Sequence, residues 1–425
     1  MRLVVGGFSE GTVYGGDKPY WDTSQLSRGL RSFALSPSGK LLGGGTAAAD
    51  ALPNPGWVAA HPTGRAVYSA CESSSNPRGT ETDVVAHAID PSTGKLTFIN
   101  RVVCGDGGCF ASVSKNGLFL LVSCIGTSEV AVFPILPGGG LASAVERRSI
   151  RAALGLAADV DSNAHSVVLS PSNRLAVVSD LALARVLVYR FDSERGSLKF
   201  HSATESGTYP GGRARHLVFQ PVAMASSSST GGHDSAPLAF GMNQGKGGVD
   251  EGSVSVYTVH EHRLLQQQGK PILELVERVS SLPEGHVPSP EQAAIGGAAI
   301  QVSSDGRHLY CSNRGDESIA MFRINHGGND GGTTSSSRNA GRRQQHRYLT
   351  LLGHVPCGGL TPRDIKICGN FLLVANQDSH NVVTLAIDQE SGLLRHTGHK
   401  EEIAAPNCIC LLPSPSPSRQ ILASL

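Results

Sequence analysis

Several polar side chains of this sequence stand at matching places in repeated segments, and their types suit chemistry on an anionic substrate. Three precede apolar runs and four follow them: His165, Arg215 and Arg363 come before, and Glu72, Gln244, Arg314 and Gln377 come after. Guanidinium groups bind phosphate or carboxylate through paired hydrogen bonds, and an imidazole exchanges a proton near neutral pH. If these side chains converge, the sequence predicts a site for a small anionic molecule.

Each of these residues also has a structural interpretation. His165 can cap a turn, and Arg215 and Arg314 can form salt bridges that space neighbouring segments. Asp180 and Asp378 are interpreted as residues that brace turns. Four asparagines are predicted to order turns through bonds from the side chain to the backbone: Asn54, Asn243, Asn313 and Asn376. The recurrence of polar residues at equivalent places, rather than any single residue, favours a shared site.

These places recur because the chain repeats an apolar strand, a turn and a second apolar strand. Six copies of this first unit occupy 57–72, 110–124, 165–180, 216–244, 298–314 and 363–377. A second unit, made of a strand, a polar turn and a Leu-bearing strand, follows each copy, most clearly at 84–96, 186–198 and 382–394. Self-similarity at this period predicts a repeat architecture.

A seventh second unit, 31–41, comes before all the others and has no first unit of its own. The two ends of the chain can supply it, one strand from 2–8 and its partner from 407–413. Each pair of units then forms a four-stranded blade, and pairing of the terminal strands closes a ring without exposed sheet edges. The predicted fold is all-β, a seven-bladed β-propeller; an open solenoid or two sandwiches are the alternatives.

The propeller is predicted to form a single domain over 1–425. Two segments interrupt the repeat, at about 222–236 and 325–347, and both are rich in Ser, Gly and Asn or Asp. Such segments bury too little apolar surface to order themselves. We therefore expect flexible loops on the rim of the propeller. The innermost strands would surround a channel, with the ligand site at one end of it.

Composition excludes several classes of function. With 36 Lys and Arg against 35 Asp and Glu, nothing favours nucleic acid as a partner. No apolar run is long enough to span a membrane, and the first residues lack the apolar core of a signal peptide. The spacing of the nine cysteines fits no zinc site. We expect a cytoplasmic protein with buried, reduced thiols and no metal; protein partners cannot be named.

The repeated motifs resemble those of the lactonase family of seven-bladed propellers, over about 1–412. The similar segments are NPGWVAAHPTGRAVYSACE, HSVVLSP, RARHLVF, LYCSNRGDESIAMFRI and TPRDIKI…FLLVANQDSHNVV, and the most specific of them is SNRGDESIAMFRI followed by LLVANQDSHNVV. The family includes bacterial 6-phosphogluconolactonases and fungal carboxy-cis,cis-muconate cyclases. The resemblance implies an enzyme that needs no metal or other cofactor and acts on a lactone, with roles for His165, Arg215 and Arg314.

Two departures from the family's pattern bear on the site. The family has a glutamate where this chain has Gln244, and another where it has Ala299. Glutamine cannot take or give a proton near neutral pH, although it can bind a hydroxyl. Glu72 is a candidate for the missing carboxylate.

The functional hypothesis is hydrolysis of a sugar lactone, 6-phosphoglucono-δ-lactone first, within the pentose phosphate pathway. His165 would activate water, Arg215 and Arg314 would hold the anionic group and the oxyanion, and Gln244 and Gln377 would orient hydroxyls. Glu72 and Arg363 complete the predicted substrate-binding set. The alternatives are a muconate-type cyclase and a non-catalytic propeller, which a large exposed apolar patch would favour.

Overall fold

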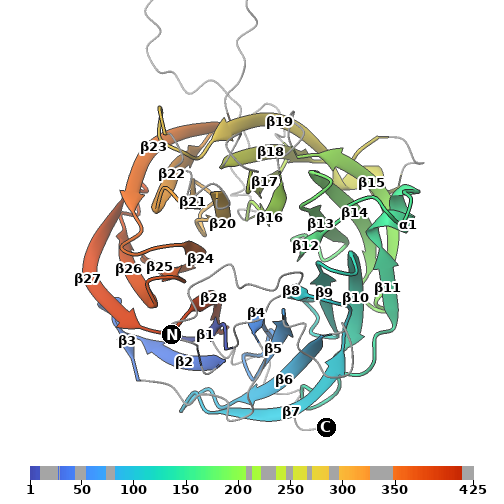
Figure 1. Cartoon of the computed structure of the whole chain (residues 1–425), viewed down its shortest axis with the longest axis horizontal. Coiled ribbons are helices and arrows are strands. Elements are labelled where there is room, and N and C mark those ends of the chain that lie inside the picture. Colours follow the sequence, from blue (N-terminus) through green and yellow to red (C-terminus); the bar gives the residue numbers. More distant parts are fainter. Residues whose placement is uncertain are drawn as a thin grey trace, which may run out of the picture.

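The computed structural model shows a ring of seven sheets, each with four antiparallel strands (Figure 1). It describes residues 1–9, 27, 29–43, 54–72, 82–206, 213–221, 236–245, 252–265, 270–286, 296–325 and 348–413. The predicted all-β, seven-bladed propeller is therefore confirmed. The extent of the domain over 1–425 stays a prediction, and the insertions at 222–236 and 325–347 lie outside the described residues except at Ala236 and Asn325.

The blades follow the chain, and the first strand of each is innermost except in the blade that closes the ring. Blade 1 contains β28 (Pro406–Leu411), β1 (Arg2–Gly7), β2 (Leu30–Leu35) and β3 (Leu41–Leu42). Blade 2 contains β4 (Pro55–Ala60), β5 (Ala66–Cys71), β6 (Asp83–Ile89) and β7 (Leu96–Val103). Blade 3 contains β8 (Gly108–Val113), β9 (Phe119–Cys124), β10 (Glu129–Pro134) and β11 (Glu146–Ser149). Blade 4 contains β12 (Ala164–Leu169), β13 (Leu175–Asp180), β14 (Arg185–Asp192) and β15 (Ser197–Glu205), and blade 5 contains β16 (Ala214–Phe219), β17 (Leu238–Asn243), β18 (Ser253–Val259) and β19 (Leu273–Ser280). Blade 6 contains β20 (Gly296–Val302), β21 (His308–Arg314), β22 (Ser318–Ile324) and β23 (Leu349–Pro356), and blade 7 contains β24 (Pro362–Cys368), β25 (Phe371–Asn376), β26 (Asn381–Ile387) and β27 (Leu394–Glu402). Two short helical segments, α1 (Ile150–Leu154) and η1 (Glu261–Leu265), connect strands.

The outer hairpins follow from a repeated turn sequence. In blade 2, the Asp90 carboxylate accepts hydrogen bonds from the backbone N–H groups of Ser92 and Thr93, and Gly94 takes a φ of 80°. Glycine adopts this left-handed conformation without steric cost. The same arrangement recurs at Asp192 and at Asp388. The turns predicted between the second-unit strands therefore form as local motifs.

The core lies between blades rather than inside one of them. Seven apolar clusters each join two neighbouring blades around the ring. The cluster at the closing seam packs Leu3 and Phe33 of blade 1 against Leu373 and Val382 of blade 7. Because both faces of every blade are covered in this way, the second strands are buried along nearly their whole length.

The two ends of the chain close the ring as predicted. In blade 1, β1 and β28 pair antiparallel, with Val4 opposite Cys410 and Val5 opposite Ile409. At Gly6, an added Cβ would lie 2.7 Å from the Sγ atom of Cys408, so only glycine permits this approach. The strands β28 and β1 thus lie side by side in the sheet of blade 1, beside the N-terminus in Figure 1.

The predicted bracing residues also take the roles expected of them. Asp180 accepts bonds from the hydroxyl of Ser162 and from the backbone of Asn163. The amide nitrogens of Asn313 and Asn376 donate to backbone carbonyls of Ser281 and Cys357. All nine cysteines are buried and none forms a disulfide, as expected. Among the residues described, no helix is long and apolar enough to cross a membrane.

Candidate functional site

Every innermost strand has a β-bulge near its start, and the bulges lie together at one end of the central channel. At each bulge, an extra residue interrupts the ladder between the first and second strands. From blade 1 to blade 7, these positions hold Asn407, Gly56, Cys109, His165, Arg215, the pair Ala298–Ala299, and Arg363. A bulge re-aims a side chain. We call the end of the channel formed by these residues and those that follow the second strands the mouth.

Glu72 and Arg363 form a buried ion pair in the mouth. The Nη2 atom of Arg363 lies 3.3 Å from Oε1 of Glu72, and both side chains are less than a tenth exposed. The guanidinium also lies over the ring of Phe8, 4.9 Å from its centre. A Cβ at Gly56 would lie 2.5 Å from Oε1 of Glu72, so the glycine leaves room for this carboxylate. Glu72 thus fills the bulge position of blade 2.

Arg215 and Arg314 are held by backbone carbonyls of β20. Arg215 donates from Nη1 to the carbonyl of Ala298 at 2.6 Å, which links blade 5 to blade 6. Arg314 donates from Nε to Gly296 at 3.2 Å and from Nη2 to Gly297 at 3.4 Å. Carbonyl acceptors fix the direction of a guanidinium group without cancelling its charge. Both arginines therefore anchor on the backbone of one strand, β20, of the neighbouring or the same blade.

His165 lies among these arginines. It is 7% exposed, and burial lowers the pKa of its imidazole well below the usual 6.5, with further lowering by Arg215, Arg363 and Arg314. Repulsion between like charges weakens with distance. All three arginines lower this pKa, so all three guanidinium groups lie near the imidazole. Within the described part of the chain, Nδ1 of His165 has no hydrogen-bond partner. A neutral imidazole in this place can accept a proton from water.

The glutamines occupy the position predicted for them but differ in surroundings. The backbone N–H groups of Glu72, Gln244 and Gln377 bond to the residue before their blade's innermost strand, which makes the three positions equivalent. The side chain of Gln377 is buried, and its Nε2 donates to Asp378 at 2.9 Å. Gln244 is half-buried. Ala299 is buried and contributes no group that transfers a proton.

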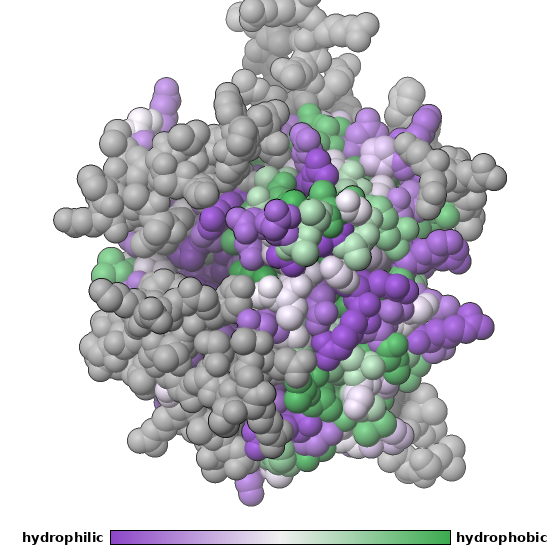
Figure 2. Space-filling view, turned by 45° about the vertical axis from the view of Figure 1, so that its right-hand side comes forward, coloured by the Kyte–Doolittle hydropathy of each residue, from purple (hydrophilic) through white to green (hydrophobic). Residues whose placement is uncertain are grey.

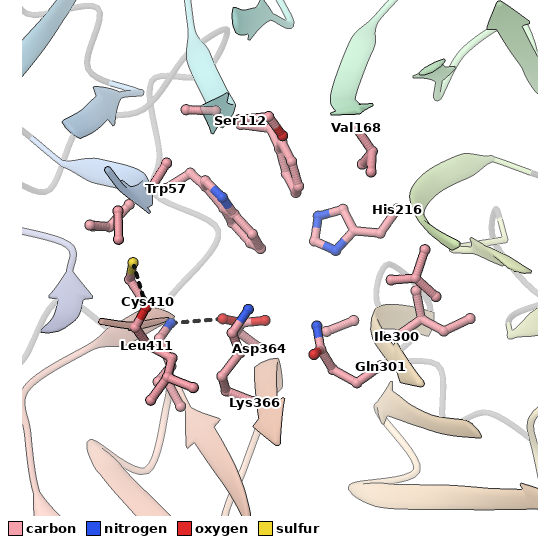
Figure 3. A pocket seen from close by; sticks show the side chains of 18 of the residues that line it. Trp57, Ser112, Val168, His216, Ile300, Gln301, Asp364, Lys366, Cys410 and Leu411 are labelled. Carbon is pink, nitrogen blue, oxygen red and sulfur yellow. Dashed lines mark hydrogen bonds between the residues drawn. The ribbon is translucent and has the colours of Figure 1, made fainter. Parts of the chain in front are cut away.

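Three aromatic rings form the floor of the mouth, and we call them the aromatic layer. Trp57 and Phe110 stack with ring centres 4.1 Å apart, and His216 stands edge-on to both at 5.2 Å. The His216 ring is 5.3 Å from that of His165. Burial, then Arg215, lowers the pKa of His216 well below 6.5, so its ring stays neutral. Figure 3 shows Trp57 and His216 reaching the middle of the channel from different blades.

Sequence reasoning did not single out Cys109 or His216. Cys109 occupies the bulge of blade 3, and its thiol donates to the carbonyl of His165 at 3.2 Å. Burial, followed by the charge of Glu72, raises the pKa of Cys109 to about 12, which keeps the thiol protonated. Its place at a strand entrance, equivalent to that of His165, was a signal available in the repeat.

Two further observations concern the exposed surface, where a large apolar patch would favour a non-catalytic propeller, and the side chains that could bind a metal ion. Figure 2 shows apolar side chains in small groups among polar ones on one face of the molecule. Within the described ranges, no three His, Cys, Asp or Glu side chains are grouped so that they could hold a metal ion.

Comparison with known proteins identifies the family. The family model "Lactonase, 7-bladed beta-propeller" matches residues 12–412. A 6-phosphogluconolactonase of Bacillus subtilis is 26% identical over 395 residues, covering 91% of this chain and 95% of that protein. Another 6-phosphogluconolactonase, from Formosa agariphila, is 26% identical over 353 residues, covering 81% of this chain and 85% of its own length.

Solved structures share the fold. A protein from Lactobacillus plantarum superposes with a TM-score of 0.70 at 22% identity, covering 96% of this chain and 98% of that one. The periplasmic gluconolactonase of Pseudomonas aeruginosa gives a TM-score of 0.69 at 23% identity, with the same coverage. The predicted resemblance is confirmed: this chain belongs to the lactonase family of seven-bladed β-propellers and is a lactonase-type enzyme.

Proposed function

We propose that the mouth hydrolyses a sugar lactone that carries an anionic group, with 6-phosphoglucono-δ-lactone as the first candidate. The observation that carries this proposal is a buried, neutral His165 among three arginines. A phosphate matches the charge of these arginines. The related 6-phosphogluconolactonases support the same substrate class. With this substrate, the enzyme would serve the pentose phosphate pathway in the cytoplasm.

In the proposed reaction, His165 takes a proton from water as the water oxygen attacks the lactone carbonyl. The ring carbon–oxygen bond then breaks, and the imidazolium returns the proton to the leaving alkoxide. Arg215 and Arg314 neutralise the oxyanion and hold the phosphate. Arg363, positioned by Glu72, adds a third positive charge to the mouth. Gln244 binds a hydroxyl without taking part in proton transfer.

The test is hydrolysis of freshly generated 6-phosphoglucono-δ-lactone by the purified protein, measured against the spontaneous rate. Glucono-δ-lactone and a carboxymuconolactone serve as comparison substrates. We expect the largest acceleration for the phosphorylated lactone. A greater acceleration for the carboxymuconolactone would move the assignment to the muconate-type reaction, which the same arginines could serve. No acceleration with any of the three would contradict the proposal.

A further inference from the structure

A cavity lies along the central channel, on the side of the aromatic layer away from the bulges. Its volume is about 310 Å³. It is lined by the innermost strands after their bulges, and its polar side chains, besides His216 and Cys410, are Ser112, Gln301, Asp364 and Lys366 (Figure 3). We call it the lower cavity. This volume is within the range of small-molecule sites.

The lower cavity has unused hydrogen-bonding capacity. Gln301 and Lys366 line it from β20 and β24, and neither side chain forms a hydrogen bond or an ion pair with any residue in the described ranges. Asp364 behaves differently, because its Oδ2 accepts the backbone N–H of Ile409 at 2.7 Å. An amide and an ammonium group are thus available to a ligand on the side of the cavity opposite Trp57 (Figure 3).

The charge of the lower cavity differs from that of the mouth. The mouth brings three arginines together with the carboxylate of Glu72, whereas the charged side chains that line the lower cavity are one ammonium, on Lys366, and one carboxylate, on Asp364. His216, which forms part of its lining, stays neutral. A cavity without net charge gives no advantage to an anion, so its ligand should differ in charge from the substrate of the mouth.

We propose that the lower cavity is a second ligand site, for an uncharged cyclic polyol of about the size of one pyranose ring. Such a ring presents an apolar face of C–H groups, which can pack on Trp57, and hydroxyls at its edge, which can bond to Gln301 and Lys366. The aromatic layer separates this ligand from the mouth. The site does not depend on the reaction proposed for the mouth.

The chain itself carries the reporter for a binding experiment. It has two tryptophans, Trp21 and Trp57, so Trp21→Phe leaves Trp57 as the single source of indole fluorescence. Methyl β-D-glucopyranoside, which is uncharged and stable, is titrated into this variant. We expect a saturable change in fluorescence. Gln301→Leu should weaken binding about three- to tenfold, the loss that corresponds to one hydrogen bond.

A mouth variant is the matched control. Arg314→Met in the same background should leave the affinity for the glucoside unchanged, and 6-phosphogluconate should not compete. Absence of a saturable change would overturn the proposal, and so would binding that responds to Arg314→Met but not to Gln301→Leu. If Trp21→Phe fails to fold, saturation-transfer NMR on the unaltered chain and on Gln301→Leu makes the same comparison. Because no hydrolysis is measured, failure here leaves the proposed lactonase reaction standing.

Discussion

The reactivity of individual side chains in the mouth depends on their charges. His165 is kept neutral by burial and by Arg215, Arg363 and Arg314, the same cations that would attract an anionic lactone. A base that bound its own proton more tightly would be occupied at neutral pH. The arginines therefore serve both binding and proton transfer. Two predictions at the residue scale follow from this dual role.

The first concerns the pH dependence of hydrolysis. An ordinary histidine is half protonated at about pH 6.5. Because the pKa of His165 is lowered, its base form persists at more acidic pH than this. We expect kcat/KM to stay flat between pH 8 and 6.5 and to fall only at more acidic pH. Initial rates corrected for spontaneous hydrolysis would show this. A decline centred near pH 6.5 would mean that the imidazole is not shielded as described.

The second concerns Arg314. Its replacement by Met should raise KM for the phosphorylated lactone about tenfold or more, since bonds to charged groups contribute roughly 1.5–3 kcal/mol. Glucono-δ-lactone, which lacks the phosphate, should be little affected. Arg314→Lys, which retains the charge, should recover part of the loss. Equal losses on both lactones would count against phosphate binding by this residue.

Sequence reasoning placed several of these residues correctly in space and missed others. His165, Arg215 and Arg363 stand at one recurring place in the repeat and Glu72 and Arg314 at another, and the structure brings both sets to one end of the channel. The repeat alone could not show that Gln377 turns toward Asp378, because side-chain direction depends on local packing. The catalytic roles of His165, Arg215 and Arg314 remain proposals.

At the scale of elements, the bulges of the innermost strands decide what the channel presents. Strand periodicity predicts which residues alternate between faces, but a bulge shifts that alternation by one residue. The shift at β24 directs Arg363 to the mouth and places Asp364 against β28. Periodicity therefore predicted the strands, whereas the aromatic layer and the lower cavity needed the structure.

Between β24 and β28, the buried carboxylate of Asp364 lowers the free energy of unfolding when it is ionised, and this effect can be measured. Burial raises the pKa of Asp364 from 3.8 to about 6, while Lys366 and the N–H of Ile409 oppose the rise. Between these pH values the folded state binds more protons than the unfolded state. The ionised carboxylate therefore destabilises the fold above pH 6, and stability is recovered as the pH falls toward 4.

Asp364→Asn imitates the protonated form. At 1.36 kcal/mol per pH unit, the variant should be more stable than the unaltered chain by at most about 3 kcal/mol at pH 8, and equal to it near pH 4. Urea unfolding at pH 4, 6 and 8 measures the difference, and the exposed Asp159→Asn is the control. A variant that is less stable at pH 8 would show that the carboxylate charge strengthens the seam.

The whole molecule depends on closure of the ring by strands from opposite ends of the chain. Closure could be predicted because one repeat unit was split between the termini, and the pairing of β1 with β28 confirms it. The seven apolar clusters explain why closure matters, since every blade needs two neighbours to bury both faces. An open ring would expose two of these faces.

A double-mutant cycle across the seam tests closure in solution. Gly6→Ala would place a methyl group 2.7 Å from Sγ of Cys408, and we expect it to cost about 1–3 kcal/mol. Cys408→Ala removes that sulfur, so the cost of Gly6→Ala should fall in its presence, with a coupling of roughly 0.5 kcal/mol or more by urea unfolding. Strictly additive effects would indicate that the two ends do not pack together.

The central claim is that the mouth is a lactonase site in which His165 moves the proton. Its most direct test compares hydrolysis of 6-phosphoglucono-δ-lactone by the unaltered protein, by His165→Asn and by His396→Asn, an exposed histidine on the outermost strand β27. We predict that His165→Asn lowers kcat about 10²- to 10⁴-fold while His396→Asn retains full activity. Full activity in His165→Asn would contradict the account.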